Sequence, residues 1–187
     1  MAAAIFGYNY PAMPQSDYQA PPITPGLLRE SHLFDGLTEA TLLHLARELP
    51  TETAQPGQLL MREGDVATHM FVVLSGEVEV LHKGGADHDV RVALLGPGDF
   101  VGEMAVLDAQ PRSASVRALA PTSLLRITAD SLKRVLYDHD LSQYAVLVVN
   151  VARELSRRLR VADRVIATAS VSVAQSYVSE TRRPFSD

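Results

Sequence analysis

The chain has 187 residues, of which 47% are hydrophobic and 21% are charged, and it contains no cysteine. This length fits one domain of ordinary size with tails, and the missing cysteine excludes disulfides and thiolate zinc sites. The formal net charge of −5 argues against a dominant nucleic-acid-binding face. Neither a signal peptide nor an apolar run of the roughly 20 residues needed to span a bilayer is visible, so we expect a cytoplasmic protein without membrane insertion.

Residues 1–26 are predicted to be a disordered arm, because they are rich in Ala, Pro, Tyr and Gln and their prolines prevent a regular helix or a central strand. Residues 27–169 are expected to form the folded domain. Inside it, residues 38–49 carry leucines at helical spacing, with Thr38 as the N-cap and Pro50 as the stop.

Residues 51–127 change to short strands separated by turn residues such as Pro56-Gly57, Gly64-Asp65 and Gly96-Pro97-Gly98. About eight strands at this spacing indicate a jelly-roll sandwich or barrel. The predicted fold class is therefore α+β: an eight-stranded antiparallel β jelly roll flanked by helices, with a long C-terminal helix.

Jelly rolls also house metal-dependent cupin enzymes, which need two or three histidines and a carboxylate that converge from neighbouring strands. His69, His82 and His88 are the candidates in the strand region, but they form no His-x-His pair and His88 sits in a predicted loop. We therefore expect that the chain has no metal site and that it is not an enzyme.

The C-terminal part predicts a short helix at residues 130–137, a long helix at residues 140–169 and a polar tail at residues 170–187. Apolar residues in the long helix follow steps of four and three, the a/d spacing of a coiled coil. We call this row the seam: Leu141, Ala145, Val148, Ala152, Leu155, Leu159, Ala162, Ile166 and Ala169. The seam predicts a parallel homodimer, and a helix packed only on its own domain is the alternative.

Residues 100–116 carry the clearest chemistry. Gly102 precedes residues 103–107, which lack strand alternation and suit one helical turn whose free N–H groups attract an anion. Arg112 can return its guanidinium to that spot, where it fits phosphate oxygens. Glu103 would repel a phosphate unless it faces a hydroxyl, so the two residues together indicate a ligand with a sugar and a phosphate. A plain loop salt bridge is the alternative.

On these residues the chain resembles the cyclic-nucleotide-binding domain shared by the bacterial catabolite activator, eukaryotic cyclic-nucleotide-dependent kinases and nucleotide-gated channels. The resemblance covers roughly residues 33–166, and its most specific part is Gly102-Glu103 followed by residues 112–116. It implies that Glu103 holds the ribose 2′-hydroxyl, Arg112 the cyclic phosphate, and the backbone of Ser113 and Ala114 the remaining phosphate oxygens. Met104 completes this expected cassette.

The resemblance also implies that Arg158 lies where the long helix of the family reaches the nucleotide. Hydroxyl residues touch the adenine there in the family, whereas this chain has Ala162 and Asp163. The base therefore stays open: cAMP is favoured by its frequency in the family, and cGMP is the alternative because a carboxylate can accept both edge donors of guanine.

The implied function is a stand-alone cyclic-nucleotide receptor that needs no cofactor and signals through an unidentified effector protein. Relatives of the activator carry a helix-turn-helix domain after the long helix, and the eighteen residues of the tail cannot form one, so no direct DNA binding is expected. Two other functions stay open: a ligand-free degenerate domain that acts as a protein-interaction module, and a receptor for a cyclic dinucleotide.

Overall fold

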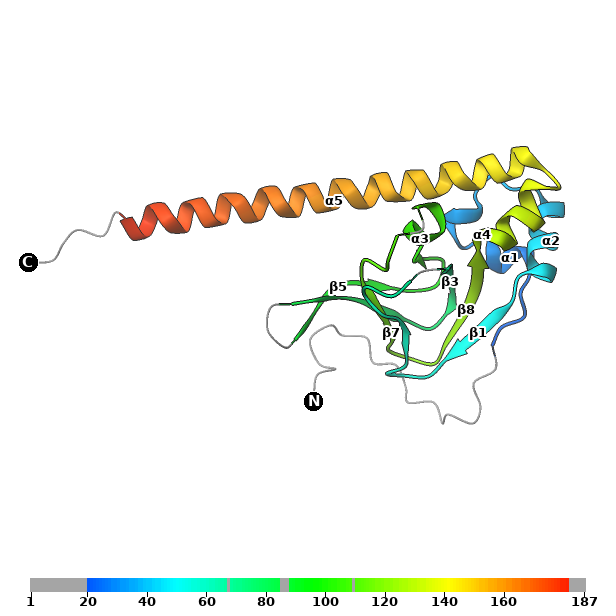
Figure 1. Cartoon of the computed structure of the whole chain (residues 1–187), viewed down its shortest axis with the longest axis horizontal. Coiled ribbons are helices and arrows are strands. Elements are labelled where there is room, and N and C mark those ends of the chain that lie inside the picture. The colour runs from blue at the N-terminus through cyan, green and yellow to red at the C-terminus, as the bar shows by residue number, and fades with distance from the viewer. Residues whose placement is uncertain (1–19, 67, 85–87, 109, 182–187) are drawn as a thin grey trace, which may run out of the picture. The chain divides into compact units, whose positions relative to one another are not determined.

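A computed structural model of the protein describes residues 20–66, 68–84, 88–108 and 110–181 (Figure 1). Most of the predicted N-terminal arm, residues 1–19, lies outside the described residues. The chain divides into two compact units, Met1–Leu147 and Val148–Asp187, and both sheets belong to the first.

The described part of the first unit contains eight strands in two antiparallel sheets, which confirms the predicted fold class. One sheet has the strand order β1-β8-β3-β6 and the other the order β2-β7-β4-β5. The strands are β1 (Thr51–Ala54), β2 (Leu59–Met61), β3 (His69–Ser75), β4 (Val78–Lys83), β5 (Asp89–Leu95), β6 (Phe100–Val101), β7 (Ser115–Ala118) and β8 (Thr122–Thr128).

The hydrophobic core lies between the two sheets. Phe71 and Leu124 of one sheet pack there with Val78 and Val116 of the other. Neighbouring residues of a strand point to opposite faces, and Met70, next to Phe71, is buried as well. The first sheet therefore has buried side chains on both faces, and the second sheet covers one of these faces.

From residue 20 onward, three short helices precede the strands: α1 (Pro25–Leu28), η1 (His32–Phe34) and α2 (Glu39–Glu48). Thr38 caps α2 as predicted, because its Oγ1 accepts the N–H of Thr41 at 3.3 Å. The prediction of a helix-free arm up to residue 26 is wrong at Pro25, because this residue opens α1. A proline fits the first turn of a helix because the N–H that it lacks would have no helical partner there.

After β8 follow α4 (Ala129–Leu132), a π-helical turn η2 (Lys133–Tyr137) and α5 (Leu141–Thr181). The short helix predicted at residues 130–137 is thus present, with a wider second half. Figure 1 shows α1, α2 and α4 gathered at one end of the sheets. Asp140 caps α5, because its Oδ1 accepts the N–H groups of Ser142 (3.0 Å) and Gln143 (3.2 Å).

The predicted end of the long helix at residue 169 was wrong, because α5 continues to Thr181 through most of the predicted tail. No glycine or proline interrupts residues 141–181, and the first proline beyond them is Pro184. A missing apolar period therefore does not exclude a helical backbone. Residues 182–187 of the tail lie outside the described residues.

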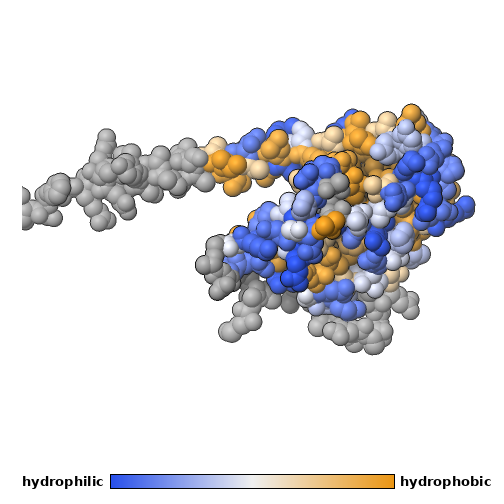
Figure 2. Space-filling model, in the orientation of Figure 1, coloured by the Kyte–Doolittle hydropathy of each residue, from blue (hydrophilic) through white to orange (hydrophobic). Residues whose placement is uncertain are grey.

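Large apolar side chains reach the surface of α5 (Figure 2). The exposed ones include Leu159, Val161, Val165 and Ile166. Even so, none of the helices described here is long and apolar enough to cross a membrane.

Candidate functional site

The predicted cassette is assembled around a buried arginine. Arg112 is 7% exposed, and its guanidinium donates from Nη1 to the carbonyl of Gly102 (3.2 Å) and from Nη2 to the carbonyl of His69 (2.6 Å). Gly102 has φ +83°, and a Cβ there would lie 2.5 Å from Nη1 of Arg112. The absent side chain therefore makes room for the guanidinium as well as for the turn.

The backbone of Arg112 is fixed by the turn between β2 and β3. Its N–H donates to the carbonyl of Asp65 (2.9 Å), and its own carbonyl accepts the N–H of Gly64 (2.8 Å). Burial lowers the pKa of Arg112, whereas the charges of Asp65 and Glu103 oppose that shift. An arginine stays cationic under such a shift, so the loop holds a fixed positive charge.

Glu103 is the second buried charge of the cassette, at 3% exposure. It stands at the start of the short helix α3 (Met104–Asp108), and its carbonyl accepts the N–H groups of Val106 (3.1 Å) and Leu107 (3.2 Å). The predicted helical turn at residues 103–107 is thereby confirmed. A buried carboxylate beside a buried guanidinium offers an acceptor and a set of donors within one loop pair.

The other predicted cassette residues lie at the same place. Met104 is exposed on α3, and the Ser113 hydroxyl contacts its sulfur at 3.9 Å. Ala114 is half-buried just before β7. The structure thus brings together six of the nine predicted site residues: Gly102, Glu103, Met104, Arg112, Ser113 and Ala114.

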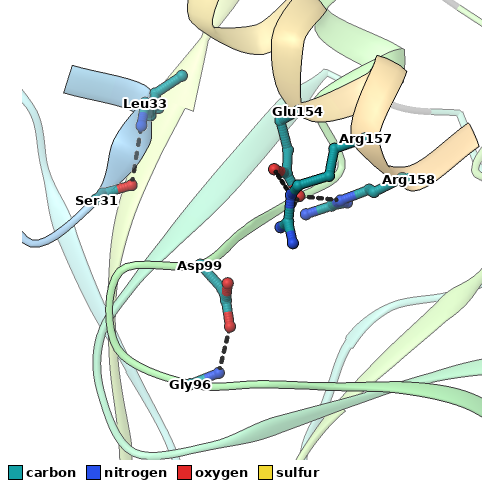
Figure 3. Close-up of polar contacts among 7 residues, drawn as sticks. All are labelled: Ser31, Leu33, Gly96, Asp99, Glu154, Arg157 and Arg158. Carbon is teal, nitrogen blue, oxygen red and sulfur yellow. Dashed lines mark hydrogen bonds and ion pairs between the residues drawn. The ribbon is translucent and has the colours of Figure 1, made fainter. Parts of the chain in front are cut away.

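The turn that leads into the cassette is closed by its own side chain. Asp99 Oδ2 accepts the N–H of Gly96 at 2.9 Å (Figure 3), and the N–H of Gly98 donates to the carbonyl of Val73 at 2.9 Å. These bonds tie the segment before β6 to β3, the strand that also supplies the His69 carbonyl.

His69 is a part of this site that the sequence did not predict. Its carbonyl accepts from Arg112, and its ring stacks edge-on against Phe71 with 4.9 Å between ring centroids. Burial, followed by the charges of Arg112 and Arg126, lowers the pKa of His69 to about 4. Within the described residues, no group of three or more His, Asp or Glu side chains could hold a metal ion.

The depressed pKa of His69 predicts a pH dependence of stability. The pKa falls from 6.5 to about 4 on folding, so the unfolded chain takes up the proton first as the pH drops. The contribution to the free energy of unfolding is therefore complete above about pH 6.5 and is lost as the pH falls toward 4. Urea denaturation at about pH 7 and about pH 5 should show a smaller loss for His69→Gln than for the wild type. An equal loss in both proteins would contradict this assignment.

The three remaining predicted site residues, Arg158, Ala162 and Asp163, lie on α5 in the second compact unit. Figure 3 shows Arg158 and Arg157 turned toward Glu154 of the same helix. Arg158 Nε donates to Glu154 Oε1 at 2.8 Å, and Arg157 reaches both carboxylate oxygens at 2.7 and 2.8 Å. Hydrogen bonds from Arg157 and then from Arg158 lower the pKa of Glu154.

Comparison with known proteins gives a family match over the strand region. The family described as "Cyclic nucleotide-binding domain" matches residues 51–139. The Cyclic AMP receptor protein of Thermus thermophilus is 33% identical over 158 residues, which is 81% of this chain and 68% of that protein.

A channel protein and a solved structure are also similar to this chain. A cyclic nucleotide-gated potassium channel of Rhizobium etli is 38% identical over 97 residues, which is 52% of this chain and 26% of the channel. The crystal structure of the Thermus thermophilus catabolite activator protein has a TM-score of 0.66 and 30% identity, and the match covers 75% of this chain and 63% of that one. The chain thus spans about a quarter of the length of the channel and less than two thirds of the activator structure.

Proposed function

Because the chain belongs to the family of cyclic nucleotide-binding domains, we propose that it is a receptor for a cyclic nucleotide and that it regulates a partner protein. The observation that carries this proposal is the burial of Glu103 and Arg112, two opposite charges, in one loop pair. Burying a charge is costly unless it is paired or used, and a cyclic phosphate with a ribose hydroxyl would use both.

In this receptor Arg112 holds the cyclic phosphate and Glu103 holds the ribose 2′-hydroxyl. The backbone of Ser113 and Ala114 supplies further donors to the phosphate. Two carbonyls already orient the Arg112 guanidinium through two of its five N–H donors. Binding therefore needs little additional ordering of this side chain, which favours affinity.

The favoured ligand is cAMP, with cGMP as the alternative. Arg158, Ala162 and Asp163 stay predictions as ligand contacts, because they belong to the second unit. The choice of base would depend on these residues only where they contact the ligand, whereas the phosphate and sugar contacts depend on the cassette.

Isothermal titration with cAMP, cGMP and cyclic di-GMP in parallel tests this proposal. We expect binding of a cyclic mononucleotide, with cAMP the tighter of the two. Binding of cyclic di-GMP alone would identify a cyclic-dinucleotide receptor. Binding of none of the three would favour the ligand-free interaction module and would contradict the receptor proposal.

We also propose that the receptor is a parallel homodimer through α5. Within the first unit, Gln143 and Leu147 are buried, and Gln143 Oε1 accepts the N–H of Thr38 at 2.8 Å. The seam residues of the same two turns point elsewhere, because Leu141 is 58% exposed and Ala145 is exposed as well. The start of α5 thus uses one face for its own domain and leaves the seam uncovered.

Farther along α5, Val148 and Leu155 of the seam are half-buried, whereas Ala152, Leu159, Ala162 and Ile166 are exposed. Leu159 is 62% exposed and Ile166 is 64% exposed. A second copy of the same helix would bury both residues in a knobs-into-holes interface. This exposure supports the dimer rather than a helix packed only on its own domain.

The proposed output is regulatory and not catalytic. Nucleotide binding would shift the population of α5 positions, and an effector protein would distinguish between those positions. Signalling through an effector protein, the absence of direct DNA binding and a cytoplasmic location stay predictions.

A further inference from the structure

Two charged residues of α5 lie directly beside the seam. With Leu155 and Ala162 at d positions and Leu159 and Ile166 at a positions, the residues that flank the seam fall at e and g. These flanking residues are Ser142, Val149, Ser156 and Asp163 at e, and Tyr144, Val151, Arg158 and Val165 at g. Arg158 and Asp163 are the charged members of this set, and they carry opposite signs.

The spacing of the two residues matches a contact between parallel helices. In a parallel coiled coil a g residue lies beside the e residue that follows five positions later on the other helix, and ion pairs at these positions set partner choice and orientation. Arg158 and Asp163 are five positions apart. We propose that Arg158 of each chain pairs with Asp163 of the partner subunit and that these two symmetric pairs fix the parallel register of the dimer. This inference rests on the dimer proposed above.

A contact within α5 holds the Arg158 side chain in place. Glu154, at a c position, accepts the Nε–H of Arg158 at 2.8 Å and so restrains the side chain (Figure 3). Arg157, at an f position, occupies both oxygens of the same carboxylate. Arg158 itself is half-buried in the single chain, with 34% of its side-chain surface exposed, and the planar fork of a guanidinium suits a carboxylate.

Asp163 is exposed on the surface of the helix in the single chain. A residue that contacts a partner chain needs this exposure. The pair explains why a carboxylate stands where the resemblance led us to expect a hydroxyl that contacts the base. It assigns Arg158 and Asp163 to the dimer and leaves the cassette to bind the phosphate and the sugar. An antiparallel pair would place g beside g and e beside e, so the complementarity favours parallel helices.

Charge reversal tests the pair in the full chain by sedimentation equilibrium without nucleotide. We expect Arg158→Glu and Asp163→Arg each to raise the dimer dissociation constant roughly tenfold, since two contacts per dimer change from attraction to repulsion. The double variant Arg158→Glu/Asp163→Arg should return to within about threefold of the wild type, because it exchanges the two charges. Arg160→Glu, at an outward b position, is the matched control and should stay within about twofold of the wild type.

A cysteine cross-link measures whether the two α5 helices of the dimer are parallel. The chain has no cysteine, so Ile166→Cys introduces a single thiol at an a position. Oxidation should cross-link a parallel dimer through this thiol, and absence of the cross-link in a wild-type-like dimer would overturn the parallel arrangement. The ion pair alone would be overturned if none of the charge changes altered the dimer dissociation constant. It would also be overturned if the double variant dimerised as weakly as the two single variants. A wild-type monomer would overturn the proposed dimer and this inference with it.

Discussion

Replacement of Arg112 by alanine is expected to abolish measurable cyclic-nucleotide binding in isothermal titration with cAMP. The guanidinium is buried, and in the proposed complex it is the charge that faces the cyclic phosphate. Removing one member of a desolvated charge pair costs about 2–5 kcal/mol. The affinity should therefore fall roughly thirtyfold to several thousandfold.

The Arg112→Ala variant also removes the two hydrogen bonds to the carbonyls of Gly102 and His69, so its folding must be measured. Circular dichroism and thermal melting serve this purpose. Arg112→Lys is a second variant that keeps the charge but loses the fork, and it should bind more weakly than the wild type while remaining folded.

Arg117→Ala is a matched control for the loss of an arginine. Arg117 lies on β7, and its Nε donates to Glu79 at 2.7 Å instead of entering the cassette. We expect the nucleotide affinity of this variant to be unchanged. An Arg112→Ala protein that binds within about threefold of the wild type, a difference of less than 1 kcal/mol, would place the site elsewhere.

The cassette could be predicted from the sequence because its chemistry is local. Gly102, Glu103 and Arg112 lie in one short stretch, where a glycine turn and a proline turn limit the paths that the chain can take. The cap at Thr38 is local as well. In such segments the residue types indicate both the local backbone geometry and the chemistry of the ligand.

His69 could not be predicted because its role depends on its backbone. The carbonyl that accepts from Arg112 would be present with any residue at this position, and only the path of β3 brings it there. The low pKa of its ring likewise depends on burial and on Arg126, which the β3–β8 register places opposite Phe71. No signal in the sequence marks either contact.

The helix ends show a different limit. The helix-breaking effect of proline predicts an arm at Pro25, but a first-turn proline is compatible with α1. The lack of an apolar period predicts a tail at residues 170–181, yet these residues continue α5. An apolar period indicates which face of a helix is buried, so its absence does not exclude a helical backbone.

Leu155→Glu together with Leu159→Glu is expected to convert the proposed dimer to a monomer in light scattering at micromolar protein. A leucine buried in an interface contributes about 1.5–3 kcal/mol, and each substitution removes that burial from both helices while placing like charges side by side. The dimer dissociation constant should therefore rise by at least about a hundredfold.

Leu155 is half-buried in the single chain, so its substitution could also disturb the fold. Leu159→Glu with Ile166→Glu avoids this ambiguity, because both side chains are exposed in the single chain and belong to the seam. Val161→Glu with Ala167→Glu is the matched control, since it adds the same two charges at c and b positions outside the seam, where both residues are exposed in the single chain. We expect the control to remain a dimer and both seam variants to be folded monomers that keep the cassette. A monomer mass for the wild type, or seam variants that associate as tightly as the control, would show that α5 does not join two chains.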